Sequence, residues 1–396
     1  MNRHKSILIA VKILMELKKS RKPPYFYQMR CVLILLTLLP AQLFAQASLS
    51  NGVAFGANYM GGKIFLHTPK INVSQPAYSS GLELSYRKQT TGTKDWHQRF
   101  GFPEVGLNVF LSNNGSALLG HAIGIYPSIQ FRILSLHKAY WYGKFGGGIG
   151  YVSKHWERTP AADSMNNIVG SAVNNFTMLQ TGIRFLMSDY LTAQVGLHFY
   201  HLSNAAARSP NYGINTYGLH AGINVHPQQV VRQFDSRSLT HFKNPLNLCF
   251  SSTMAVAEDK TPDGPLYPVF TGTVSAYGMY RNKNRILLGA DAIYDYHTRA
   301  LIHDGFQMKE GAYLSPWQYT AFAGHEFLFG KISFPLIVGA YLNRPVGGKK
   351  MYQKLGMNYH FYRHPSMIVK DAFLSLVLKT HLAQAQYAEL GFGFFL

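Results

Sequence analysis

Cysteines and charged residues are scarce in this sequence of 396 residues. Cys31 and Cys249 are its only two cysteines, too few for a disulfide framework, and neither has the Cys or His spacing of a zinc site. Charged residues make up only 14% of the chain against 47% hydrophobic residues, a composition too apolar for a disordered chain. HExxH, GxSxG and the Gly-rich phosphate loop are absent as well, so the common soluble enzyme classes have no signature here.

Long apolar runs are also scarce, because only one exists and it lies near the start of the chain. Residues 29–47, MRCVLILLTLLPAQLFAQA, have a basic start, a short apolar core and small residues Ala45 and Ala47 at signal-peptidase spacing. The core falls short of the roughly 20 residues of a membrane anchor, which favours a cleaved export signal. We therefore expect translation to begin at Met29 and residues 1–47 to be missing from the mature protein.

Acidic residues are few, since 38 Lys and Arg face 18 Asp and Glu for a formal net charge of +20. Such a balance suits nucleic acid or an anionic membrane surface. The basic residues are scattered, without the dense run of a nucleic-acid-binding arm, and export also argues against nucleic acid. We expect no nucleic-acid partner, and the charge is compatible with a leaflet rich in phosphorylated lipid.

Alternation of apolar with small or polar residues dominates the chain from residue 49 to residue 396. Each alternating segment has about 9–14 residues and ends in a turn rich in Gly, Asn, Ser or Pro, and no helical period interrupts them. This pattern predicts an all-β fold of roughly sixteen strands, with an error of about two. The expected strands are 53–60, 81–88, 104–111, 117–133, 139–152, 175–187, 189–202, 214–225, 246–256, 267–281, 285–296, 316–329, 331–343, 352–362, 372–382 and 386–396.

The last segment, AELGFGFFL, indicates where these strands lie. Leu390, Phe392 and Phe394 share one face, while Glu389 and Gly391 take the other, as a lipid-facing terminal strand requires. Together with the export signal, strands of this length predict an antiparallel transmembrane β-barrel in the outer membrane of a Gram-negative cell. The alternative is a secreted β-sandwich, whose exposed strand faces would be polar.

One connection divides the expected strands into two sets. Residues 227–245, PQQVVRQFDSRSLTHFKNP, are polar and do not alternate, and counting from a periplasmic start makes this linker periplasmic. It separates a unit at 48–226 from a C-terminal unit at 246–396. Two arrangements stay open: an eight-stranded unit joined to a second β unit, or one large barrel of 14–16 strands with a long periplasmic turn.

Polar residues interrupt the lipid-facing side of the first unit near its end. The apolar face of one expected strand runs up to Phe199 and then continues as His201 and Ser203, and Asn215 begins the apolar face of the next strand. If odd strands ascend from the periplasm, all three lie at the extracellular rim. At that rim they would lie at the same depth in the membrane as the ester linkages of the outer-leaflet lipids.

A serine, a histidine and an amide are the parts that nucleophilic catalysis needs. A serine hydroxyl attacks only when a base takes its proton, and a third group must orient the imidazole. Residues i and i+2 on a strand lie about 6.5–7 Å apart at the backbone, close enough for His201 and Ser203 to meet. Without further evidence, such a pair is more often a polar rim pair with no catalytic role.

The run HLSNAAARSPNYGIN, residues 201–215, resembles the signature of the lipid A 3-O-deacylase family, outer-membrane barrel esterases that remove the acyl chain at the 3-position of lipid A. The resemblance implies that His201 is the general base and Ser203 the nucleophile. Asn215 stands where the family usually has an acidic residue. The supporting and oxyanion positions implied by the resemblance are Asn204, Ala206 and Asn211.

The resemblance covers residues 48–226 and implies a carboxylic ester hydrolase that acts on lipid A of lipopolysaccharide without metal or organic cofactor. The amide at Asn215 can orient an imidazole but cannot stabilise an imidazolium by charge. A passive channel and a lipid-binding scaffold without turnover stay open as alternatives. The acyl position, the oligomeric state and the role of residues 227–396 stay open too.

Overall fold

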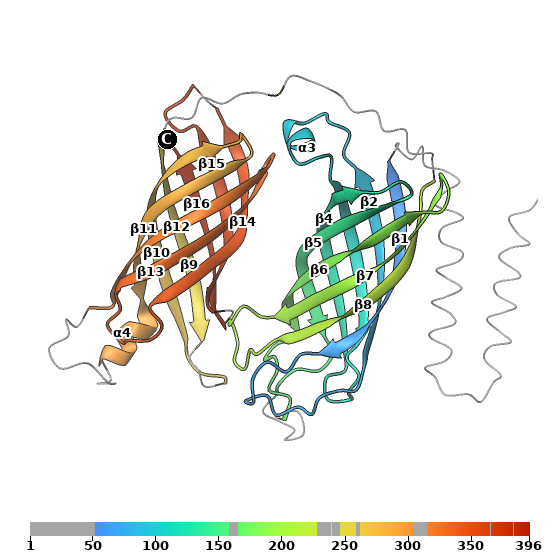
Figure 1. The fold of residues 1–396 in the computed structure, drawn as a ribbon. Coiled ribbons are helices and arrows are strands. Elements are labelled where there is room, and N and C mark those ends of the chain that lie inside the picture. Colours follow the sequence, from blue (N-terminus) through green and yellow to red (C-terminus); the bar gives the residue numbers. More distant parts are fainter. Residues whose placement is uncertain are drawn as a thin grey trace, which may run out of the picture. The chain divides into compact units, whose positions relative to one another are not determined.

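The computed structural model describes residues 52–157, 165–227, 239, 246–258, 262–303, 315–364, 366–382 and 384–396. These residues form two closed antiparallel barrels of eight strands each (Figure 1). The all-β prediction is confirmed, and the arrangement as one large barrel is wrong. The expected signal at 29–47, the start at Met29 and almost all of the linker at 227–245 lie outside the described residues.

In the first barrel each strand pairs with the next along the chain, and the last strand returns to pair with the first. Its strands are β1 (Val53–Ile64), β2 (Ser79–Gln89), β3 (Glu104–Asn113), β4 (His121–Ser135), β5 (Ala139–Val152), β6 (Val173–Leu186), β7 (Leu191–Ser203) and β8 (Ile214–Val225).

The second barrel closes in the same way, because its last strand pairs with its first. Its strands are β9 (Asn247–Glu258), β10 (Leu266–Tyr280), β11 (Asn284–Asp295), β12 (Trp317–Phe329), β13 (Ile332–Asn343), β14 (Met351–Arg363), β15 (Asp371–His381) and β16 (Gln384–Phe395).

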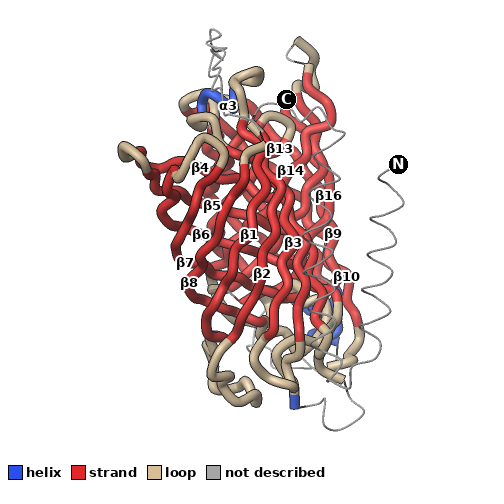
Figure 2. The backbone as a smooth tube through the Cα atoms, turned by 90° about the vertical axis from the view of Figure 1, so that its right-hand side faces the viewer, coloured by secondary structure: helices blue, strands red, loops and turns tan. Residues whose placement is uncertain are grey.

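Among the described residues, short helices lie in two of the connections between strands, which the alternation did not predict (Figure 2). The first, α3 (Asp95–Arg99), lies in the connection between β2 and β3, and the second, α4 (Tyr296–His303), follows β11. Both are too short to affect the hydrophobic period of the strands around them. In the part of the chain that the structure describes, no helix is long and apolar enough to cross a membrane.

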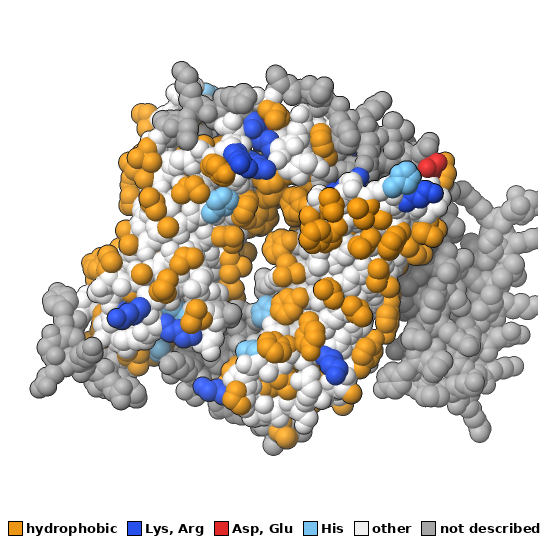
Figure 3. Space-filling model, in the orientation of Figure 1, with side chains coloured by type: hydrophobic (Ala, Val, Ile, Leu, Met, Phe, Trp, Pro, Cys, Tyr) orange, Lys and Arg blue, Asp and Glu red, His pale blue; other side chains and the backbone are white. Residues whose placement is uncertain are grey.

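Apolar side chains cover the outer walls, and polar side chains fill the interiors. On β7, Val195 and Leu197 are 47% and 59% exposed, whereas their neighbours Gln194 and His198 are buried in the barrel. Figure 3 shows hydrophobic side chains spread over the strands of both barrels. This inverted pattern is that of a barrel surrounded by lipid. It excludes the β-sandwich alternative, whose outer faces would be polar.

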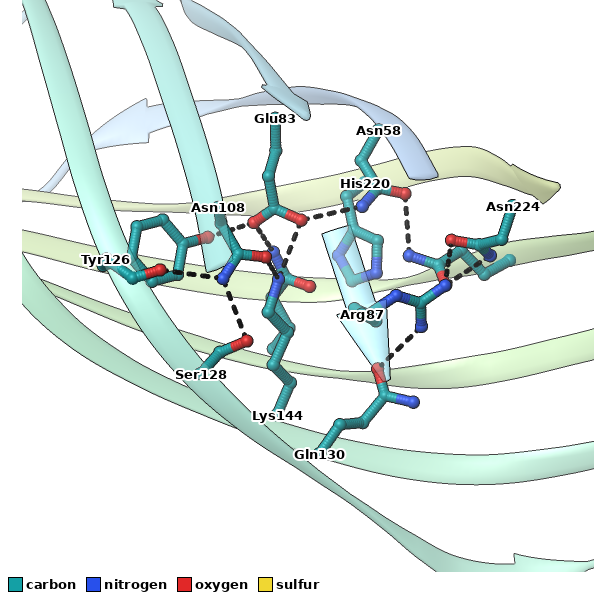
Figure 4. Close-up of polar contacts among 12 residues, drawn as sticks. Asn58, Glu83, Arg87, Asn108, Tyr126, Ser128, Gln130, Lys144, His220 and Asn224 are labelled. Atoms are coloured by element: carbon teal, nitrogen blue, oxygen red, sulfur yellow. Dashed lines mark hydrogen bonds and ion pairs between the residues drawn. The ribbon is translucent and has the colours of Figure 1, made fainter. Parts of the chain in front are cut away.

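Hydrogen-bonded polar residues occupy the interior of the first barrel (Figure 4). The Nζ of Lys144 lies 2.9 Å from Oε1 of Glu83 and 2.8 Å from Oδ1 of Asn108, and Tyr126 donates its hydroxyl to Glu83. All four side chains are buried. An eight-stranded barrel is just wide enough for side chains to fill, and a buried charge is tolerated only when it is paired.

The second barrel has a filled interior as well. The Nζ of Lys354 lies 3.0 Å from Asp291 and 3.2 Å from Glu389, and Arg285 pairs with Glu326 at 3.0 Å. These five side chains are buried. The alternative of one large ring, which would enclose a wide aqueous lumen, gives way to two narrow barrels packed with side chains.

Candidate active site

The pairing of two neighbouring strands assembles the site. Strands β7 and β8 are antiparallel, and their register sets His201 directly opposite Asn215. Ser203 lies two residues beyond His201 and therefore projects from the same outer face of the wall. Two strand ends thus bring together, on the outside of the first barrel, the three residues that the sequence pattern singled out.

The three side chains form one hydrogen-bonded series. The Nε2 of His201 lies 2.8 Å from Oγ of Ser203, and its Nδ1 lies 2.7 Å from Oδ1 of Asn215. An amide oxygen only accepts hydrogen bonds, so Nδ1 carries the proton and Nε2 keeps its lone pair. The lone pair then accepts the hydrogen of the Ser203 hydroxyl, which is the arrangement of a serine with its general base.

The loop after Ser203 turns through two left-handed residues. Ala205 has φ 56° and Ala206 has φ 62°, a conformation that costs a residue with a side chain about 1 kcal/mol or more. Asn204 fixes the loop from inside, because its backbone N–H donates to Oδ1 of Asn211 at 3.0 Å and its Nδ2 donates to the carbonyl of Arg208 at 2.9 Å. The backbone N–H directly after the serine is therefore engaged by Asn211.

Asn204 and Asn211 therefore stabilise the loop by hydrogen bonds within it. The backbone carbonyl of Ile168 adds two more bonds, because it accepts from the N–H groups of Tyr212 and Gly213 at 2.8 and 2.9 Å. The loop is tied to the segment before β6 as well as to itself. Strain at two alanines persists only where the surroundings determine the backbone in this way.

Gly213 supports the imidazole from the other side. It has φ +79°, and a Cβ added there would lie 2.8 Å from Cε1 of His201 and 3.0 Å from the carbonyl of Leu202. Both the backbone angle and the close approach require glycine at this position. Gly213 falls within the motif at 201–215, but the sequence could not reveal its contact with His201.

An apolar groove of about 730 Å³ lies beside the hydrogen-bonded series on the outer wall. Phe199 and Tyr217 line it, and each is two residues from a member of the series on the same strand face. Its lining continues across the wall through Leu197, Leu219, Leu179 and Phe145. The polar series therefore stands at the edge of a surface that suits a hydrocarbon chain.

Two more observations complete the description of the site. His67, after β1, contacts Asn215, with 3.3 Å between Nδ1 of the imidazole and Nδ2 of the amide. No spacing rule links residues 67 and 215, so the sequence could not reveal this contact. Within the described ranges, no group of three His, Cys, Asp or Glu residues is placed to hold a metal ion.

Comparison with protein families bears on the same residues. Residues 80–224 match the family model described as lipid A 3-O-deacylase (PagL). The first barrel carries a PagL family domain. The match includes His201, Ser203 and Asn215, and it confirms the resemblance seen in the motif. Residues 244–396, which contain the second barrel, match the model described as acyloxyacyl hydrolase, C-terminal domain.

Solved structures with similar folds are distant. Neisserial surface protein A (NspA) is 11% identical, covers 44% of this chain and 97% of its own, and has a TM-score of 0.32. The outer membrane enzyme PagL is 16% identical, covers 42% and 97%, and has a TM-score of 0.30. A mutant of the TodX monoaromatic hydrocarbon channel is 12% identical over 91% and 92%, with a TM-score of 0.17. A search of the curated proteins found no match.

Proposed function

We propose that the PagL domain of this chain is an outer-membrane serine esterase that removes an ester-linked acyl chain, the one at the 3-O position, from lipid A. The observation that carries the proposal is the series from Ser203 through His201 to Asn215 on the lipid-facing wall. The tautomer of His201 leaves the lone pair of Nε2 next to the Ser203 hydroxyl. An apolar groove lies two residues away along the same strand faces.

Attack on the ester begins at the serine. His201 takes the hydroxyl proton on Nε2 while Oγ of Ser203 bonds to the acyl carbonyl carbon. The carbonyl oxygen becomes an oxyanion, and we assign its stabilisation to the N–H groups of Ala205 and Ala206. When the intermediate collapses, the ester C–O bond breaks, and the imidazolium gives its proton to the departing sugar oxygen.

Release of the acyl chain repeats these steps with water. His201 removes a proton from water, the hydroxide oxygen bonds to the acyl carbon, and the bond to Ser203 breaks as Oγ recovers its proton. The products are a free fatty acid and a lipid A that has lost one chain.

The groove supports an acyl substrate rather than a polar one. Its lining side chains, Phe199, Leu197 and Leu219 among them, face the same side as the nucleophile. A chain lying along this wall exchanges lipid neighbours for protein neighbours of similar polarity, so the groove orients the chain more than it attracts it. Orientation of the carbonyl at the serine is what catalysis needs from it.

Asn215 supplies orientation without charge. In a serine protease, exchange of the acid for an amide costs about 10⁴ in rate through the wrong tautomer. Here the amide oxygen accepts from Nδ1, so the tautomer is the productive one. The remaining cost is the missing stabilisation of the imidazolium, and we expect a slower enzyme rather than an inactive one.

The same proposal includes the route to the membrane. Translation starts at Met29, the signal at 29–47 is cleaved, and residues 227–245 form a periplasmic connection. On this scheme the units 48–226 and 246–396 both insert in the outer membrane. The basic charge of the chain suits a leaflet with phosphorylated lipid headgroups.

Mass spectrometry of lipid A tests the proposal. Cells expressing the protein should yield lipid A lighter by one hydroxyacyl chain, and cells expressing Ser203→Ala should not. Heat modifiability on gels serves as the control that both proteins are folded. Identical spectra with both proteins folded would favour a barrel that binds lipid without turnover, and conductance in planar bilayers would instead favour a channel.

A further inference from the structure

The amide of Asn215 is held on three sides. Its oxygen lies against His201, and its Nδ2 lies 3.3 Å from the carbonyl of Gly213 and 3.3 Å from Nδ1 of His67. His67 reaches this position because the pairing of β1 with β8 continues past the end of β1. The N–H of Phe65 donates to the backbone carbonyl of Asn215 at 2.7 Å, and His67 follows two residues later.

The two ends of an amide have opposite effects on the base. With Oδ1 toward His201, Nδ1 carries the proton and Nε2 is free to accept the hydroxyl hydrogen of Ser203. If the amide turned over, Nδ2 would donate to Nδ1, and the proton would move to Nε2. The imidazole would then point an N–H at the serine and could not act as a base.

We propose that His67 is a positioning residue that selects the productive orientation of the Asn215 amide, an inference that rests on the proposed esterase function. With its proton on Nε2, His67 accepts one hydrogen of Nδ2 at Nδ1, and the carbonyl of Gly213 accepts the other. A turned amide would present its oxygen to the carbonyl of Gly213, a lone-pair repulsion in place of a hydrogen bond. It would also require His67 to move its proton from Nε2 to Nδ1.

A carboxylate at position 215 would not need this selection. Its two oxygens are equivalent, so either one accepts from Nδ1 of His201. The role of His67 is therefore tied to the amide that this chain has in place of the usual acid. The tie predicts that the effect of removing His67 depends on which residue stands at position 215.

Four proteins test this dependence: the parent, His67→Ala, Asn215→Asp and the double variant. The primary measurement is the rate at which a fluorophosphonate labels Ser203 in each folded barrel, because it requires no lipid A. We expect His67→Ala to slow labelling about threefold to tenfold when residue 215 is Asn, the worth of one hydrogen bond. With Asp at position 215, the same substitution should leave the rate within about twofold.

Two further measurements distinguish a positioning role of His67 from a role in binding the substrate. On lipid A the loss in His67→Ala should appear in kcat with KM unchanged, since a residue that held substrate would change KM instead. His121→Ala is the matched control, because His121 is also an exposed histidine, at the first residue of β4 and without contact to Asn215. It should label at the parent rate.

An equal loss from His67→Ala with Asn or Asp at position 215 would overturn the inference, and so would no loss in either. An unlabelled Ser203 in the parent would overturn it together with the proposed function. Labelling that follows the predicted pattern in a protein that leaves lipid A intact would support the positioning role and refute only the proposed substrate.

Discussion

Each barrel holds a serine, a histidine and a third residue in hydrogen-bonded series. In the first barrel the series faces outward from the wall. In the second barrel, Oγ of Ser333 lies 2.8 Å from Nε2 of His360, and Nδ1 of His360 lies 2.7 Å from Oδ1 of Asp371. By distance and residue type the second series is nearer to a protease triad than the first, because it has an acid.

The two serines differ in the hydrogen bonds that their neighbours make with them. Ser333 donates its hydroxyl hydrogen to Glu326 at 2.5 Å, so its remaining contact is with an N–H of His360. In this arrangement Nε2 of His360 donates to Ser333, so it does not offer a lone pair to the hydroxyl hydrogen. Ser333 is 0% exposed and faces the filled lumen, whereas Ser203 is 5% exposed and lies, with the half-buried His201, on the outer side of the wall near an apolar groove.

The comparison teaches that hydrogen-bond distances alone do not identify an active serine. What decides is the direction of each hydrogen bond and whether a substrate can reach the hydroxyl. The acid in the second barrel also accepts from Arg285 at 3.1 Å and Arg363 at 3.2 Å, so it belongs to a network of paired charges. We interpret that network as the packing of a narrow barrel.

The largest expected difference between the two serines is in activity. Ser203→Ala should lower fatty acid release from lipid A by at least about 10³-fold, because it removes the nucleophile. Ser333→Ala should leave the rate within about twofold. Release is measured with purified barrels and lipid A in detergent, and a strong loss in Ser333→Ala with the barrel folded would break the comparison.

The opposite order should hold for stability. Asp371→Asn removes the negative charge that pairs with Arg285 and His360, and breaking a buried pair costs about 3 kcal/mol or more. Asn215→Ala removes the side-chain contacts with His201, His67 and Gly213 at the outer surface and should cost about 1 kcal/mol. Urea titration followed by the gel mobility of the folded barrel compares the two variants. Equal midpoints would contradict the structural role of the second series.

A substitution behind the imidazole sharpens the account of the first series. Gly213→Ala places a Cβ 2.8 Å from Cε1 of His201 and forces φ +79° on a residue with a side chain. Displacement of a catalytic group by about 1 Å costs roughly 10²-fold in rate. We expect kcat to fall by that order, with KM little changed. A variant that folds and keeps the parent kcat would show that the position of the imidazole matters less than we infer.

A smaller effect is expected when the first series is given the acid that the second one has. Asn215→Asp should raise kcat about tenfold, because a carboxylate stabilises the imidazolium by charge while the tautomer is already correct. A rise near 10⁴-fold would instead mean that the amide in the parent holds the wrong tautomer. Single-turnover rates on lipid A measure this directly, with Asn211→Asp as a charge-matched control in the neighbouring loop.

Much of this molecule could be predicted from the sequence. Alternation with period two predicted all sixteen strands within a few residues, because each strand separates lipid from a polar interior. The same alternation predicted that His201 and Ser203 share the outer face. Because the two strands follow each other along the chain, pairing them as one hairpin was enough to bring Asn215 next to His201.

The rest depends on closure of the barrels, which local patterns do not contain. The sequence left one barrel and two barrels equally open, since the pairings of β8 with β1 and of β16 with β9 are long-range. His67 reaches Asn215 only through the first of these pairings. The series around Ser333 was missed because its three members lie on three separate strands with no motif to connect them.

The most direct test of the central claim is the map of fluorophosphonate adducts on the folded protein in outer-membrane vesicles. Digestion and mass spectrometry identify the labelled serine. We predict an adduct on Ser203, none on Ser333, and no adduct in the Ser203→Ala variant. An adduct on Ser333, or a parent protein in which Ser203 stays unlabelled, would contradict the account.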